Sequence, residues 1–181
     1  MKAKFVVLVT SLLLCAGTSW AQGERKNLQV FNEISTSVNR YSFFTIFDDV
    51  NASVENGNVT LTGKVTQPFK RDDIEKRVQK IDGVQHVTNR IEVLPVSIFD
   101  EQLRYRIARS IYGNSNFWNY AIMANPPIHI IVEHGHVTLT GVVQSNVDRM
   151  LARSLATQFG AMSVKNELKT EAEVRNQLEK S

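Results

Sequence analysis

The residue types best suited to chemistry gather in one short segment, which contains His129, Glu133, His134 and His136. Imidazole and carboxylate groups bind transition metals when three or four of them converge on one point. His134 and His136 flank Gly135 in a predicted turn, so their side chains can approach each other, whereas His129 lies back along a strand. The segment therefore has two interpretations: a metal site, or solvent-facing turn and strand residues.

A repeat within the chain favours the second interpretation. Residues 54–65 read VENGNVTLTGKV, and residues 132–143 read VEHGHVTLTGVV. Asn56 and Asn58 stand where the second copy has its two turn histidines, so the repeated unit does not require histidine there. We therefore predict no metal and no cofactor. A unit that occurs twice also favours a binding or scaffolding role over a single-site enzyme.

Composition and motifs point away from catalysis as well. The chain has 181 residues, of which 43% are hydrophobic and 22% charged, which is ordinary for a globular protein with room for two small modules. The sequence contains no P-loop, no dinucleotide-binding glycine pattern, no Gly-x-Ser-x-Gly and no His-Glu-x-x-His. We predict that the protein has no catalytic residues.

The first residues predict an export signal. Lys2 and Lys4 precede an apolar run over 5–15 that is too short to span a bilayer, and small residues occupy both sides of Trp20. We predict a cleaved signal peptide over 1–21 and a periplasmic location. The alternative is acylation of Cys15, which is disfavoured because the residue before it is a leucine.

Signal cleavage changes two properties of the chain. Cys15, the only cysteine, leaves with the signal, so no disulfide is expected. The loss of Lys2 and Lys4 also lowers the formal net charge from +3 to about +1. We therefore predict no nucleic-acid partner, because the mature chain lacks a strongly basic balance.

Each copy predicts the order helix, strand, strand, helix, strand. Apolar residues three or four apart indicate one buried face per helix, and strict alternation in the strands predicts an antiparallel sheet with one buried and one wet face. Asn56-Gly57 is typical of a type I′ hairpin turn. The glycine inside each second strand indicates a bulge or a close helix crossing, and Asp100 is a candidate N-cap. The helix positions are Val30, Ile34 and Val38, then Ile74, Val78 and Ile81, then Leu103, Ile107 and Ile111, then Val147, Leu151 and Leu155.

These motifs resemble the BON family, the bacterial osmotically inducible and nodulation domain. The shared pattern is Val-x-x-Gly-x-Val-x-Leu-x-Gly-x-Val, an amphipathic helix, and a closing Val-x-Asn-x-Ile/Leu strand that contains Asn89 or Asn166. The resemblance implies an α+β fold of two tandem αββαβ sandwich modules, each a small mixed sheet packed against two helices. We place module 1 at 26–94, module 2 at 99–170 and a charged tail at 171–181. The resemblance to the BON family also implies a periplasmic, non-enzymatic protein that contacts phospholipid membranes or other envelope components. The residues that match the family define the fold.

Two features outside the shared pattern are candidates for ligand contact. An aromatic loop follows the first helix of each copy, and it either covers its own core or faces a partner; the loop of the second copy is longer. Arginines on the second copy's helices are either a solvated face or a site for anionic head groups. The loop residues are Tyr41, Phe43, Phe44, Ile46 and Phe47, then Tyr112, Phe117, Trp118, Tyr120, Ile122 and Met123; the arginines are Arg104, Arg106, Arg109, Arg149 and Arg153.

From these features we predict association with an anionic phospholipid surface through the second module. The expected lipid contacts are Phe117, Trp118, Tyr120, Arg149 and Arg153. Aromatic side chains with one polar end suit the membrane interface, and arginine suits lipid phosphates. The alternative is a periplasmic chaperone-like protein that binds polypeptides or envelope proteins.

Overall fold

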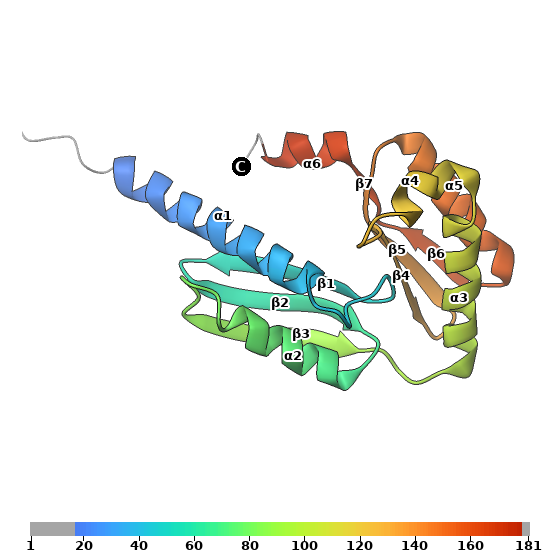
Figure 1. Cartoon of the computed structure of the whole chain (residues 1–181), viewed down its shortest axis with the longest axis horizontal. Helices are drawn as coiled ribbons and strands as arrows, with labels where there is room; N and C mark the ends of the chain where they lie inside the picture. Colours follow the sequence, from blue (N-terminus) through green and yellow to red (C-terminus); the bar gives the residue numbers. More distant parts are fainter. Residues whose placement is uncertain (1–16, 179–181) are drawn as a thin grey trace, which may run out of the picture.

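The computed structural model describes residues 17–178 and shows two α+β modules joined by a short linker (Figure 1). The expected fold class is confirmed. Module 1 contains α1 (Gly17–Asn39), β1 (Asp49–Glu55), β2 (Asn58–Val65), α2 (Pro68–Val78) and β3 (His86–Val93). Module 2 contains α3 (Ile98–Tyr112), the 3-10 turn η1 (Ser115–Phe117), α4 (Trp118–Ala121), β4 (Ile128–Glu133), β5 (His136–Val143), α5 (Asn146–Ala156), η2 (Thr157–Phe159), β6 (Ser163–Asn166) and β7 (Lys169–Thr170). The chain then continues into α6 (Glu171–Leu178).

Both sheets are mixed. In the order β1-β2-β3, the hairpin is antiparallel and β3 runs parallel to β2; β4-β5-β6 repeats this plan, and β7 adds a short parallel pairing to β5. The mixed sheet that the resemblance implies is confirmed, whereas the antiparallel pairing expected from alternation applies to the hairpin and not to the third strand. The reason is the intervening helix, which carries the chain back across the sheet so that the next strand starts at the same end.

Most of the predicted apolar positions form two separate cores. The exception is α5, where Val147 is exposed and the helix buries Ala152 and Ala156 instead, because these residues face the sheet. In module 1 the helix residues Val30, Ile34 and Val38 pack with Leu61 and Ile74, all of them buried. Module 2 repeats the arrangement with Leu103, Ile107 and Ile111 against the β4–β5 hairpin. Burial of such side chains stabilises the fold by about 1.5–3 kcal/mol each, so the repeated apolar positions largely determine the architecture.

The asparagine that both closing strands share tethers each strand to a helix. Asn89 donates from Nδ2 to the carbonyl of Arg71 at 3.2 Å and accepts from the Ile91 N–H at 3.0 Å. Asn166 donates to the carbonyl of Arg149 at 2.8 Å. These hydrogen bonds explain why both copies carry asparagine there, which is a structural role.

The hairpin turns and strand glycines follow backbone geometry. Asn56 and His134 have φ of 49° and 51°, and each precedes a glycine with positive φ, as type I′ turns require. A Cβ on Gly63 would lie 2.2 Å from the carbonyl oxygen of Asp49, and one on Gly141 would lie 1.9 Å from that of Pro127. Glycine at these two positions therefore leaves room for the backbone at the start of the neighbouring strand. The bulge or helix crossing we expected is wrong.

Asp100 is not the N-cap of α3. That position belongs to Ser97, whose side chain accepts from the Asp100 N–H. The carboxylate of Asp100 is buried and accepts from the backbone N–H groups of His134 and Gly135, at 2.9 and 2.8 Å. Asp100 thus holds the β4–β5 turn against α3.

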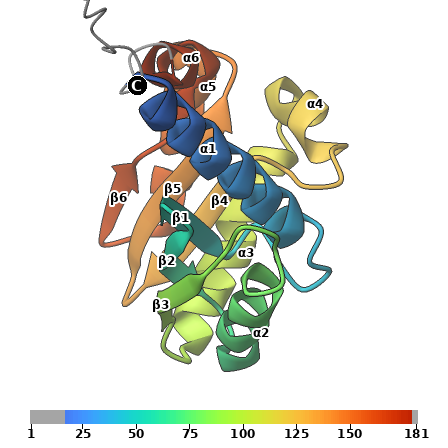
Figure 2. The ribbon, with the colours of Figure 1, turned by 90° about the vertical axis from the view of Figure 1, so that its left-hand side faces the viewer.

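The loop between α1 and β1 leaves module 1 and packs against module 2. The Ile130 N–H on β4 donates to the carbonyl of Ile46 at 2.7 Å, and Ile46 and Phe47 join the apolar cluster of module 2. The ring of Phe47 meets that of Tyr105 edge-on, with centroids 5.2 Å apart. The modules therefore share a joint. In Figure 2, which looks from the module 1 side, strands β1, β2 and β3 lie in front of β4 and β5. The single wet face we predicted fits module 1, but in module 2 Ile131 is buried on the second face as well.

The two ends of the chain are helical where they are described. The predicted tail, 171–181, forms α6 up to Leu178; Thr170 and Glu173 cap its start reciprocally, with hydrogen bonds of 2.8 and 3.2 Å. Most of the predicted signal peptide, residues 1–16, lies outside the described residues, and α1 runs continuously past the expected cleavage position. Within 17–178, none of the helices combines the length and apolar character needed to cross a bilayer.

Candidate lipid-binding surface

The aromatic loop of module 2 separates its members into buried and exposed side chains. Phe117 and Tyr120 are 0% and 4% exposed, with ring centroids 5.8 Å apart. The Tyr120 hydroxyl donates to Asp148 at 2.9 Å and accepts from the Gln144 N–H at 2.8 Å. Burial raises the pKa of Tyr120 above its ordinary value. Phe117 and Tyr120 therefore cap the core, and our expectation that they face lipid does not hold in this structure.

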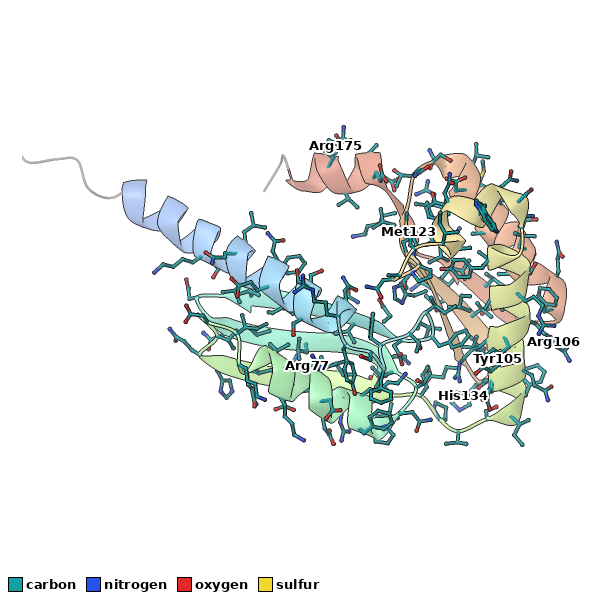
Figure 3. All side chains as sticks on the ribbon, viewed as in Figure 1. Arg77, Tyr105, Arg106, Met123, His134 and Arg175 are labelled. Atoms are coloured by element: carbon teal, nitrogen blue, oxygen red, sulfur yellow. The ribbon has the colours of Figure 1, made fainter. Side chains whose placement is uncertain are left out.

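Trp118 lies between these two anchors and points the other way. Its side chain is 66% exposed, and Ile122 and Met123 on the same turn are exposed too. The Tyr120–Asp148 hydrogen bond fixes this turn beside the start of α5, where Val147 and Met150 are also exposed. Figure 3 shows Met123 at the α4 end of module 2. We call these five exposed side chains the apolar end of module 2.

The arginines of α3 and α5 fall into three groups. Arg104 is buried and donates to the carbonyl of Val132 at 2.7 Å, and burial lowers its pKa. Arg149 is half-buried and binds both carboxylate oxygens of Glu173, at 2.9 and 3.0 Å. The remaining three are exposed and form no ion pair within the described residues: Arg106, Arg109 and Arg153.

The face that carries these three arginines has a positive balance. Among the carboxylates of α3 and α5, Asp100 is buried and Asp148 is bound to Tyr120, which leaves Glu101 as the exposed acid. Arg106 points away from the sheet (Figure 3). On α5 the exposed residues Val147, Met150 and Arg153 lie three apart, so this helix presents apolar groups and a cation on one face, an arrangement typical of membrane-surface helices.

The histidines do not converge. His129 donates from Nδ1 to the backbone carbonyl of Asp48 at 2.6 Å, and His136 contacts Ser163 Oγ at 2.7 Å. His134 is exposed, and Glu133 pairs with Lys64 of module 1. Over residues 17–178, no three His, Cys, Asp or Glu side chains are placed to hold a metal ion. The solvent-facing interpretation describes His134 and His136, whereas His129 belongs to the joint between modules.

The aromatic loop of module 1 serves that joint. Tyr41 is buried, and its hydroxyl donates to Asp73 at 2.7 Å, while Arg77 lies 4.6 Å above its ring. Burial, together with the Asp73 hydrogen bond, raises the pKa of Tyr41 to about 12. Phe44 packs on the His129 ring with centroids 5.5 Å apart. This loop is therefore a structural contact between modules.

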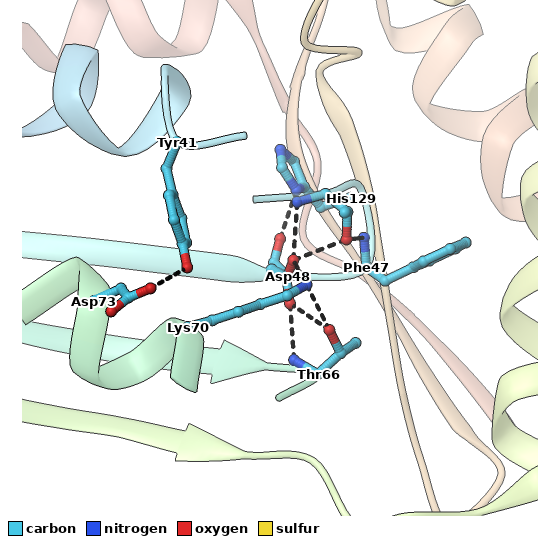
Figure 4. Close-up of polar contacts among 8 residues, drawn as sticks. Tyr41, Phe47, Asp48, Thr66, Lys70, Asp73 and His129 are labelled. Atoms are coloured by element: carbon cyan, nitrogen blue, oxygen red, sulfur yellow. Dashed lines mark hydrogen bonds and ion pairs between the residues drawn. The ribbon is translucent and has the colours of Figure 1, made fainter. Parts of the chain in front are cut away.

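A buried ion pair, which the sequence analysis missed, organises the joint (Figure 4). Asp48 is fully buried and accepts from Lys70 Nζ at 2.7 Å, from Thr66 N–H and Oγ1 at 2.7 and 2.9 Å, and from Thr45 N–H and Oγ1 at 2.8 Å. Burial alone would raise the pKa of Asp48, but the hydrogen bonds outweigh burial and hold this pKa below its ordinary value. Because the carbonyl of Asp48 also binds His129, this residue links both modules.

Lys70 could not be identified from the helix pattern. It stands among alternating charges on α2, which indicate a solvated face, yet it is only 5% exposed. The one available signal was Asp48 itself, an acidic residue that directly precedes a strand beside a run of aromatic residues. A carboxylate in such apolar surroundings needs a buried partner, and Lys70 is that partner.

Comparison with known proteins gave similar solved structures and one domain family. Two solved structures of CdsD, described as a structural protein of the type III secretion system of Chlamydia trachomatis, are similar to the chain. The first is 13% identical, covers 83% of this chain and 97% of its own, and has a TM-score of 0.30. The second, the C-terminal domain, is 12% identical, covers 78% and 96%, and has a TM-score of 0.28. Likeness at this level carries no argument about function, and among curated proteins no sequence matches this chain.

The family assignment rests on a stronger match. The pattern of the BON domain matches the chain twice, at residues 34–95 and at residues 117–172, and each match falls on one of the two modules. Together the matches cover more than half of the sequence. The chain therefore belongs to the BON domain family and carries two copies of the domain in tandem.

Proposed function

We propose that this protein is a non-enzymatic envelope protein that associates with anionic phospholipid through module 2. The observation that carries the proposal is that the helices of module 2 expose both a tryptophan and three arginines that form no ion pair within the described residues. We place the membrane contact at the apolar end of module 2, with Arg106, Arg109 and Arg153 nearby. Arg149 stays bound to Glu173 and is a secondary contact.

The energetics favour shallow, salt-sensitive binding. Each arginine near an anionic surface contributes about 1 kcal/mol, and the apolar end adds interfacial burial of aromatic and aliphatic side chains. Neither contribution approaches that of a spanning helix. We therefore expect reversible binding that weakens as salt screens the charges over about 10 Å.

The test is co-sedimentation with vesicles of phosphatidylglycerol and phosphatidylethanolamine, compared with vesicles of phosphatidylcholine. We expect binding to the anionic vesicles at low salt and loss of binding at high salt. The double variant Arg106→Gln/Arg153→Gln should bind about thirtyfold more weakly, since about 2 kcal/mol of attraction is removed. Its matched control is Lys76→Gln/Arg90→Gln, which removes two exposed cations from module 1.

The outcomes separate the interpretations. Equal weakening in both double variants would show that net charge, and not the face of module 2, drives binding. Failure of the unmodified protein to bind anionic vesicles at low salt would overturn the proposal.

A further inference from the structure

A groove with a volume of about 440 Å³ lies between α1 and β1, on the side of module 1 that faces module 2. Its apolar walls include Phe31, Ile34 and Phe44, and Val142 of module 2 lies at its far side. The volume falls within the range of about 300–1,000 Å³ that is typical of ligand sites. Because both modules line the groove, it exists only in the tandem arrangement.

One wall of this groove is a strand edge. In module 1 only β2 pairs with β1, so the backbone groups on the other edge of β1 have no partner strand. Residues Asp49–Ala52 line the groove along this edge. Figure 1 shows α1 running across the β1 side of the sheet. A groove between a helix and an open strand edge has the shape that extended peptides occupy by adding a strand.

Module 2 shows how such an edge is filled. Its equivalent edge strand, β4, is covered by the turn that contains Ile46, whose carbonyl accepts from the Ile130 N–H at 2.7 Å. Aligned on the repeat, Ile130 corresponds to Ala52, because Ile130 pairs with Leu139 as Ala52 pairs with Leu61. The N–H of Ala52 therefore points into the groove.

We infer that the edge of β1 binds an extended polypeptide segment with apolar side chains, whose carbonyl accepts from the Ala52 N–H as the carbonyl of Ile46 accepts from the Ile130 N–H on β4. Backbone pairing to Ala52 supplies the register, and Phe31 and Phe44 receive the alternate side chains. Among the described residues that line the groove, Asp49 is the one carboxylate and none is lysine or arginine. The groove thus favours peptides with basic flanks. This site is separate from the lipid-binding surface and does not depend on it.

The test uses a fluorescent peptide, acetyl-Lys-Phe-Thr-Ile-Phe-Lys-amide, which repeats the sequence of Phe44–Phe47 between two lysines. We expect saturable binding that Ala52→Pro weakens about tenfold, because proline removes the N–H that pairs with the ligand. Proline is tolerated on an edge strand where its N–H faces outward, so the variant should keep its circular dichroism spectrum and thermal midpoint. Ala52→Ser retains the N–H and should bind as the unmodified protein does.

A second peptide with glutamate in place of both lysines should bind more weakly, because it faces Asp49. Equal binding by Ala52→Pro and Ala52→Ser would overturn the inference. Displacement of the peptide by lysophosphatidylethanolamine below its micelle concentration, with no effect of Ala52→Pro, would assign the groove to a single lipid chain and overturn it as well. If Ala52→Pro unfolds, filling the groove by Ser35→Trp must abolish binding, with Thr36→Trp on the neighbouring side of α1 as its control.

Discussion

The two modules provide different hydrogen-bond acceptors for the same backbone N–H group. In module 1 the Thr66 N–H donates to the Asp48 carboxylate at 2.7 Å, and in module 2 the equivalent Gln144 N–H donates to the Tyr120 hydroxyl at 2.8 Å. The second helix then supplies the next partner, which is Lys70 in module 1 and its counterpart Asp148 in module 2. A buried donor needs an acceptor, but the fold does not determine which residue provides it.

The choice of acceptor decides what each aromatic loop is free to do. Asp48 also uses its carbonyl to bind His129, so the loop of module 1 is committed to holding module 2. Tyr120 comes from the loop of module 2 itself, which packs against its own core and leaves Trp118 exposed. We therefore expect module 1 to act as the structural partner and the loop of module 2 to contact a ligand.

The largest expected effect tests the acceptor of module 1. Asp48→Ala should lower the free energy of unfolding by about 3–5 kcal/mol, because it leaves Lys70 buried without its counter-charge. Chemical denaturation of the full chain measures this loss. A loss below about 1 kcal/mol, the level of an exposed ion pair, would contradict the role assigned to Asp48.

The corresponding change in module 2 should cost less. Tyr120→Phe keeps the ring but removes the acceptor of the Gln144 N–H, and we expect a loss of about 1–3 kcal/mol. The same denaturation experiment gives the value. If Tyr120→Phe costs as much as Asp48→Ala, then the two acceptors are energetically equivalent and the comparison fails.

The joint itself is the next target. Phe47→Ala removes a half-buried ring from Tyr105 and from the core of module 2, and should cost about 2 kcal/mol, less than the roughly 3–5 kcal/mol of a fully buried phenylalanine. The two modules should then unfold at different denaturant concentrations. Phe43→Ala, which truncates an exposed ring of the same loop, is the control. A single, unchanged transition in Phe47→Ala would show that the modules are not coupled through this loop.

Acid should destabilise module 1 by protonating the Asp48 carboxylate, and this loss of stability should be the smallest of these four predicted losses. The pKa of Asp48 is lowered in the folded state. Its carboxylate therefore contributes to the free energy of unfolding above the unfolded-state pKa of about 3.9, and this contribution is lost as the pH falls through the folded-state pKa. The unmodified protein should therefore lose stability below about pH 4. Asp48→Asn, less stable at neutral pH, should show a flatter acid profile. Parallel profiles for the two proteins would argue against the lowered pKa.

Sequence patterns predicted the regular parts of the fold because those parts depend on local periodicity. The positions of Leu61 and Leu139, the Asn56-Gly57 turn and the buried faces of α1, α2 and α3 all follow from spacing along one chain segment. The parallel third strand did not follow from alternation, because strand direction is set by the crossover helix and not by the strand's own residues.

The site was harder to predict because it depends on contacts between distant segments. Phe117, Trp118 and Tyr120 are neighbours in a loop without periodicity, so spacing cannot show that only the tryptophan is exposed. Arg104 looked like its exposed neighbours until β4 supplied a buried carbonyl for it. In each case the deciding partner lies far away in the sequence.

The most direct test of membrane binding by module 2 uses Trp118 as its own reporter. The chain has two tryptophans, and Trp20 lies within the predicted signal peptide, so in the chain without residues 1–21, or in full-length Trp20→Phe, the emission comes from Trp118 alone. On addition of phosphatidylglycerol vesicles, we predict that the emission shifts to shorter wavelength and is quenched by lipids brominated near the top of the acyl chain more than by those brominated near its end. Unchanged emission from Trp118 while the protein co-sediments with the vesicles would contradict the account, because the membrane contact would then lie elsewhere on the molecule.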